Sequence, residues 1–133
     1  TQLGIQSDVE VNGQLSVAGD IVGVVTAPSD ARLKENVDPL EDCLTKVLAL
    51  NPVTYNYINR NNREIGFIAQ EVEQIVPEVV SDTMRTGSGD PYLGVAYQNM
   101  VSLLTGAIQD LKQIVDKQQS QIQSLQQQLR EKD

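Results

Sequence analysis

The chain has 133 residues, of which 40% are apolar and 21% are charged, and it carries a formal net charge of -8. This length allows one ordinary domain, or a small domain with an appendage. The acidic balance argues against a nucleic-acid partner, because binding to nucleic acid rests mainly on basic side chains. The absence of histidine and the single cysteine, Cys43, exclude the usual zinc sites. We therefore expect no metal and no other cofactor.

The apolar runs are only a few residues long, so we expect no membrane span and no membrane partner. The first residues lack the charged and apolar regions of a secretory signal, which predicts a soluble chain or a fragment of one. Aromatic bulk comes from four tyrosines and one phenylalanine. Most apolar burial must come from Val, Leu and Ile, which suits long helix seams and stacked short strands, so self-association is expected.

Residues 1–28 contain a short repeat. Val, Gly and Leu or Ile recur every six residues in Val11–Ser16 and again in Val17–Val22. Each unit is too small to bury its own apolar face, so the pattern favours a solenoid-like β-stalk in which strands from several chains are intertwined. A single hairpin with its turn at Asn12-Gly13 is the alternative.

The segment Ser29–Asn36 lies where this strand-like run meets a helical region. Ser29 precedes Lys34 by five residues, and without histidine a lysine is the only common side-chain amine that could activate a serine. Positions i and i+5 diverge by about 140° on a helix, so such a pair needs a turn or a residue from a neighbouring chain. The alternative is that Ser29 caps a turn and Lys34 is a solvated charge.

A helix and a hairpin are predicted next. Asp38 can cap a helix that has Pro39 in its first turn and Glu41 at the capping-box position, and that ends at Asn51-Pro52. Its apolar face is predicted to carry Leu40, Leu44, Val47 and Leu48. Two strands over residues 53–58 and 64–68, with a turn at 59–62, form the hairpin.

Residues 69–76 are predicted to form a short helix ended by Pro77, and residues 78–81 a strand. Residues 81–94 are polar and rich in glycine, which predicts an extended loop or arm. Helix is expected from Val95 to the end of the chain.

This last helix has the cleanest periodicity in the sequence. Apolar residues alternate spacings of four and three, which is typical of the a and d positions of a coiled coil. Such a helix reaches about 50 Å at ~1.5 Å per residue, so its distal part needs partner helices. Gly106 is expected on the outer face, and polar Gln118 is a candidate to fix the register. The predicted seam consists of Tyr97, Val101, Leu104, Ile108, Leu111, Val115, Gln118, Ile122, Leu125 and Leu129.

Four spaced blocks together resemble the peptidase S74 family, the C-terminal intramolecular chaperone of endosialidases and of other phage tail spikes, fibres and neck appendages. They are Ser29-Asp-x-Arg-Leu-Lys-x-Asn36, Leu50-x-Pro-Val-x-Tyr-x-Tyr57, Ile65-Gly-Phe-Ile-Ala-Gln-Glu-Val72 with Pro77-Glu78, and Ala107-Ile-Gln-x-Leu111. The predicted fold is α+β, with the end of a β-stalk at 1–28, a chaperone core at 29–96 that includes the arm, and a coiled-coil helix at 97–133.

The resemblance implies a homotrimer that guides folding of its own N-terminal β-stalk and then releases itself by cutting the Pro28-Ser29 bond. Ser29 would be the nucleophile and Lys34 the general base, so the chain would be a serine endopeptidase that cuts itself once. A proline on the acyl side is unusual for the family and is expected to slow the cut. Asn36 is a candidate to orient Lys34 or to hold an oxyanion, and Gln70 and Glu71 are candidates to support the site, while capping and surface roles stay open for all three.

The chemistry sets a condition on the lysine. A lysine amine has a reference pKa near 10.4, which must fall by about three units for the group to act as a base at neutral pH. Only substantial burial lowers a pKa that far. We therefore expect Lys34 to become desolvated only when the chains have assembled around the junction.

Two rival functions remain. One is a permanent trimerising cap of a fibre protein that never cuts. The other is a fragment of a membrane-tethered transcription factor, because eukaryotic proteins resemble the same family, but the acidic charge favours neither DNA binding nor anchoring. Under the chaperone hypothesis the chain acts in the host cytoplasm during virion assembly, and the parent stalk stays in the tail or neck of the virion.

Overall fold

The computed structural model describes residues 1–85 and 89–132, which divide into two compact units, Thr1–Asn36 and Val37–Asp133. In the first unit, residues 1–28 form no helix or strand, and their side chains are exposed. The alternative hairpin at Asn12-Gly13 is therefore absent from the single chain. The solenoid-like stalk, which would need partner chains, stays a prediction. The one regular element of this unit is a 3-10 helix, η1 (Ala31–Leu33).

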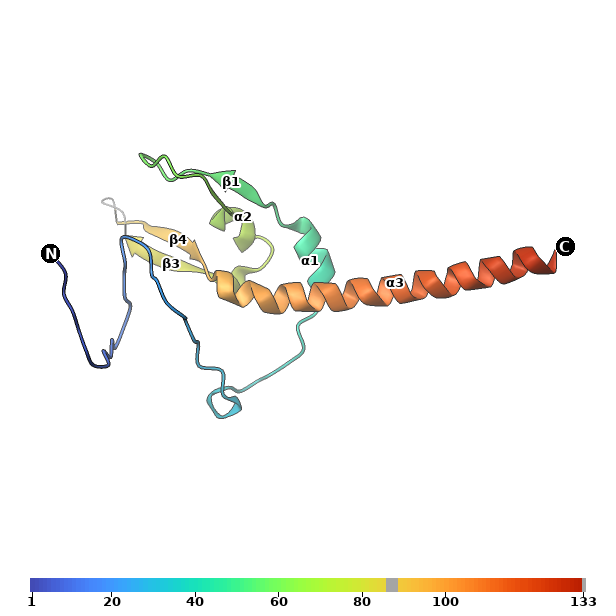
Figure 1. Cartoon of the computed structure of the whole chain (residues 1–133), viewed down its shortest axis with the longest axis horizontal. Coiled ribbons are helices and arrows are strands. Elements are labelled where there is room, and N and C mark those ends of the chain that lie inside the picture. Colours follow the sequence, from blue (N-terminus) through green and yellow to red (C-terminus); the bar gives the residue numbers. More distant parts are fainter. Residues whose placement is uncertain (86–88, 133) are drawn as a thin grey trace. The chain divides into compact units, whose positions relative to one another are not determined.

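The second unit contains helices and two small antiparallel sheets, which confirms the predicted α+β class (Figure 1). Two 3-10 turns, η2 (Pro77–Val79) and η3 (Tyr97–Asn99), lie before β3 and α3. The other elements, in chain order, are α1 (Cys43–Ala49), β1 (Val53–Tyr55), β2 (Glu64–Gly66), α2 (Ala69–Glu73), β3 (Val80–Arg85), β4 (Pro91–Val95) and α3 (Met100–Glu131).

The first hairpin confirms its prediction, although its strands are shorter than expected. β1 and β2 pair with Thr54 opposite Ile65. The second hairpin corrects a prediction, because β3 and β4 pair where residues 81–94 were expected to form a loop. The Thr83 hydroxyl donates to the Tyr92 carbonyl oxygen at 2.8 Å, and Gly94 leaves room for the Thr83 methyl group. The tip of the predicted arm, residues 86–88, lies outside the described residues.

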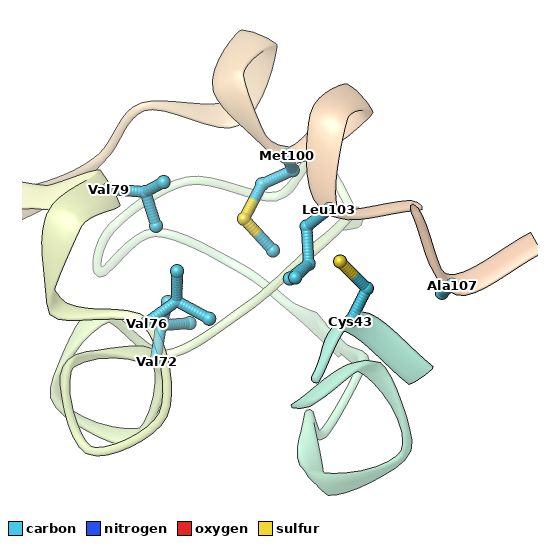
Figure 2. Packing of buried hydrophobic residues seen from close by; sticks show 7 residues of the cluster. All are labelled: Cys43, Val72, Val76, Val79, Met100, Leu103 and Ala107. Carbon is cyan, nitrogen blue, oxygen red and sulfur yellow. The ribbon is translucent and has the colours of Figure 1, made fainter. Parts of the chain in front are cut away.

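The core of the second unit lies where α1, α2 and η2 meet the start of α3 (Figure 2). Leu103 and Cys43, only 2% and 1% exposed, are at its centre. Burial of Cys43 agrees with a small apolar role for this cysteine. The full set of buried apolar residues is Cys43, Val72, Val76, Val79, Met100, Leu103 and Ala107.

The start of α1 differs from the prediction. The helix begins at Cys43 and not at Asp38, because Asp42 takes a left-handed conformation with φ 56° directly before it. No side chain of the preceding segment caps the helix. Instead, the Asp110 carboxylate of α3 accepts from the Leu44 N–H at 3.2 Å. Leu44 and Asp110 are 66 positions apart, so a long-range contact helps to set where α1 begins. Of the predicted apolar face of this helix, Leu40 and Leu48 are exposed.

Helix α3 also begins later than predicted, at Met100, because Val95 still belongs to β4. The prediction that Gly106 lies on the outer face is wrong. A Cβ atom at Gly106 would collide with the sulfur of Cys43, so α1 and α3 approach most closely at this glycine. After this contact, the C-terminal half of α3 extends beyond the other labelled elements of its unit (Figure 1).

Candidate active site and assembly seam

A tight turn links Ser29 to Lys34. Asp30 caps η1, and its carboxylate accepts from the Arg32 N–H at 2.8 Å. The Arg32 guanidinium binds the same carboxylate through Nε at 3.0 Å and through a terminal nitrogen at 2.9 Å. The Lys34 N–H then donates to the Ala31 carbonyl oxygen at 3.2 Å. These bonds reverse the chain between the two candidate catalytic residues.

The reversal places the Lys34 amine in contact with the Ser29 hydroxyl. Nζ lies 2.6 Å from Oγ, which is hydrogen-bonding distance. Both residues and Pro28 are exposed. The spacing of the two residues called for either a turn or a residue from a neighbouring chain, and the single chain itself supplies the turn. In this geometry an ammonium donates to Oγ, and a neutral amine at the same place could accept the hydroxyl proton.

The Arg32 hydrogen bonds hold the pKa of the Asp30 carboxyl below its ordinary value, the side-chain bond contributing most. A lowered pKa means that this carboxylate stabilises the turn above pH 3.8 and stops doing so as the pH falls through the lowered value. The charged form is therefore present at neutral pH, where the turn would be needed.

Removal of this carboxylate is predicted to slow any reaction that depends on the Ser29–Lys34 contact. We expect Asp30→Ala to slow self-cleavage several-fold, because the turn loses both its cap and its ion pair. Asp30→Asn keeps a capping oxygen and should lie between wild type and Asp30→Ala. The matched control is Asp38→Ala, an exposed aspartate outside the turn. A time course of the cut on denaturing gels measures the order, and equal rates for all four chains would contradict it.

The three residues predicted to support the dyad, Asn36, Gln70 and Glu71, have no contact with one another among the hydrogen bonds of the described residues. Asn36 has φ 53°, and among the described residues no hydrogen bond joins it to Ser29 or Lys34. Glu71 accepts from Asn51 Nδ2 at 3.5 Å. Gln70 borders a cavity of the second unit. Their participation in the site stays a prediction.

That cavity was not anticipated from the sequence. Its volume is about 330 Å³, and all four tyrosines and the one phenylalanine of the chain line it. The Tyr97 hydroxyl accepts from the Phe67 N–H at 2.9 Å, and the two rings stack with centroids 6.1 Å apart. A hydrogen bond with Tyr57, together with burial, raises the pKa of Tyr55 to about 12. The hydroxyl of Tyr55 is therefore neutral at physiological pH. Spacing gives no hint of this gathering, because Tyr92 and Tyr97 lie far along the chain from the other three aromatic residues.

From Val101 onward, the predicted seam runs along a face of α3 that the chain's own core does not cover, whereas Tyr97 lies in η3 before the helix. Its apolar residues from Val101 to Leu129 are between 45% and 68% exposed, and Gln118 is exposed as well. The core contacts a different face, through Met100, Leu103 and Ala107. The two faces coexist in the first turns of the helix. An amphipathic helix packed only on its own domain would leave no such second apolar face.

No helix in the described part of the chain is long and apolar enough to cross a membrane. Residues 1–85 and 89–132 contain no group of three or more histidine, cysteine, aspartate or glutamate side chains arranged to hold a metal ion.

Comparison with known proteins agrees with the sequence blocks. The family model of the peptidase S74 domain, described as the chaperone of endosialidase, matches residues 29–81. Over 99 residues, 71% of this chain, the sequence is 35% identical to the long tail fiber protein Gp37 of Enterobacteria phage K3. It is 36% identical over 92 residues, 64% of the chain, to the Gp37 protein of Enterobacteria phage M1.

A eukaryotic protein is similar too. The myelin regulatory factor homolog 1 of Caenorhabditis elegans is 33% identical over 94 residues, 60% of this chain and 10% of that protein. The chain spans only 8% of the phage K3 protein and 36% of the phage M1 protein. The family match begins at Ser29, the first residue of the tight turn. The predicted resemblance is thus confirmed: residues 29–81 of this chain match the peptidase S74 family.

Proposed function

We propose that residues 29–133 are an intramolecular chaperone that assembles three chains, guides folding of the fibre stalk that precedes it, and then cuts the Pro28-Ser29 bond. The observation that carries this proposal is the 2.6 Å contact between Lys34 Nζ and Ser29 Oγ. It stands at the first residue of the family match, next to the bond that would be cut. The similarity to long tail fibre proteins makes a fibre stalk the expected substrate.

The cut can be written as a balanced sequence of steps. Neutral Lys34 takes the hydroxyl proton of Ser29 while Oγ bonds to the carbonyl carbon of Pro28. The carbon–nitrogen bond then breaks, and Lys34 returns the proton to the leaving amine of Ser29. Water hydrolyses the resulting ester, which leaves a carboxylate on Pro28, a free amino group on Ser29 and the Ser29 hydroxyl restored. No metal or cofactor is needed for these steps.

Assembly would supply what the single chain lacks. Lys34 is exposed in the described chain, so its amine is solvated. Bringing three chains together along the α3 seam would crowd the junction and remove water from it. The cut would then follow assembly and would report it, while the released stalk would be trapped in its folded form.

Assembly would also help the stalk to fold. Short strands shared among chains expose unpaired edges until all are in register, and such non-local pairing is slow. A coiled coil forms from local contacts and raises the effective concentration of the three stalk segments. In a phage, this process would take place in the host cell, and the stalk would enter the virion as part of a tail or neck fibre.

Protection from proteolysis tests the chaperone role separately from the cut. We expect residues 1–28 of the Ser29→Ala chain to resist thermolysin, which cleaves before exposed apolar residues, when the chains are assembled. The same residues should be digested at least about tenfold faster when Leu111→Asp and Val115→Asp prevent assembly. Mass spectrometry of the fragments measures both rates. Equal digestion of the two chains would show that assembly does not order the stalk and would contradict the chaperone role, whether or not the bond is cut.

A further inference from the structure

A groove of about 400 Å³ runs along α3 beside the segment that precedes α1. Pro39 and Leu40 form one wall, and Val101, Thr105 and Gln109 of α3 form the other. Leu40 is 51% exposed and Val101 is 62% exposed. The groove is continuous with the predicted seam, because Val101 belongs to both.

The Leu40 wall is fixed to the core of the chain. The buried thiol of Cys43 donates to the Leu40 carbonyl oxygen at 3.4 Å. Cys43 in turn packs against Gly106, where the missing side chain lets the two elements approach. The Leu40 wall of the groove is therefore held in place by the core of the chain.

The groove lies on one flank of the predicted seam of α3. With Val101 at heptad position a, Thr105 occupies e and Gln109 occupies b, so the groove lies on the e side of the seam. The chain's own core covers the back of the helix and reaches the other side of the seam, because Leu103 occupies c, Met100 and Ala107 occupy g, and all three are buried. Each chain therefore carries core residues on the g side of α3 and an open groove on the e side.

In a parallel assembly with rotational symmetry, the e side of one helix faces the g side of the next. The groove of each chain must then face the core-bearing side of its neighbour. We propose that the neighbouring copy of this chain, through the g side of its α3 and the core packed there, covers the groove and the Leu40 side chain. This interface rests on the proposed assembly and extends it beyond the helical seam.

The interface would also connect assembly to the cut. Leu40 lies six residues after Lys34 in the chain, in the segment that joins the tight turn to α1. A neighbour that covers Leu40 would hold this segment still only in the assembled form. The order of the turn would then depend on the neighbour as well as on its own hydrogen bonds.

Thiol labelling tests the proposal in the full chain. The background is Ser29→Ala with Cys43 kept, because its thiol is buried and holds the Leu40 segment. Leu40→Cys then supplies the exposed thiol, and its labelling rate is measured at concentrations where light scattering shows the assembled state. We expect labelling at least about tenfold slower than in the same chain carrying Leu111→Asp and Val115→Asp. Ile58→Cys is the matched control, because Ile58 is 91% exposed in the β1–β2 loop, and it should react equally fast in both states.

The outcomes separate this inference from the proposed function. Fast labelling of Leu40→Cys in chains that light scattering shows to be assembled would overturn the groove interface and leave the chaperone proposal intact. Failure of the Ser29→Ala chain, with Leu40 and Cys43 intact, to assemble at any concentration would overturn the assembly itself, and the groove interface with it. Slow labelling in the assembled state and fast labelling in the monomer would support the interface.

Discussion

Replacing Lys34 by methionine is expected to reduce self-cleavage by about 10²–10⁴-fold, the usual contribution of a positioned general base. Methionine keeps much of the length of the lysine side chain but has no amine to take the proton from the Ser29 hydroxyl, 2.6 Å away. The reaction is followed as the loss of full-length chain on denaturing gels. The matched control, Lys117→Met, changes an exposed lysine of α3 outside the seam and should cut at the wild-type rate.

Lys34→Arg separates the base from a structural cation. Arginine keeps the positive charge and can still donate a hydrogen bond to Ser29, but its guanidinium stays protonated in proteins. We expect this variant to be as inactive as Lys34→Met. Rapid cutting by Lys34→Arg would mean that the residue only holds the turn, and the dyad would then be wrong.

The second large effect is expected from charges in the seam. Leu111→Asp with Val115→Asp should give a monomer that does not cut, because each seam side chain contributes about 1.5–3 kcal/mol when fully buried. Assembly would also bring the new carboxylates together around one axis. Neither residue belongs to the core of the single chain, so the domain itself should still fold. Sedimentation and gel time courses measure assembly and the cut.

The control for these charges lies on the opposite face of the same helix. Gln113→Asp with Ser120→Asp adds the same charge at exposed positions outside the seam, and this variant should assemble and cut as wild type does. Cutting by the Leu111→Asp, Val115→Asp monomer at the wild-type rate would show that the dyad needs no neighbour. The gating by assembly would then be wrong, although the dyad could stand.

Local patterns predicted much of this fold. The helix ending before Asn51-Pro52, the β1–β2 hairpin and the long last helix follow from short-range periodicity and from proline, and all are present. The start of α1 was misplaced, because its cap comes from Asp110, which is distant in sequence. The role of Gly106 was misjudged for a similar reason. A missing side chain says nothing about which element will approach it.

For the candidate site too, local features could be predicted from the sequence and long-range contacts could not. The Ser29–Lys34 contact depends on a turn of six residues, and its cap and ion pair, Asp30 and Arg32, are visible in the sequence. The core-facing side of α3 was hidden in the sequence, because Met100, Leu103 and Ala107 interleave with the heptad residues. The aromatic cavity needed the tertiary structure, since Tyr92 and Tyr97 lie far along the chain from the other aromatic residues.

Self-cleavage is tested most directly by the intact mass of the purified full chain beside that of Ser29→Ala. We expect the wild type to yield a fragment of residues 29–133 with Ser29 at its amino terminus, and Ser29→Ala to stay full length. A wild-type chain that stays whole while it is assembled, at concentrations where sedimentation shows complete assembly, would contradict the cut and favour a permanent cap.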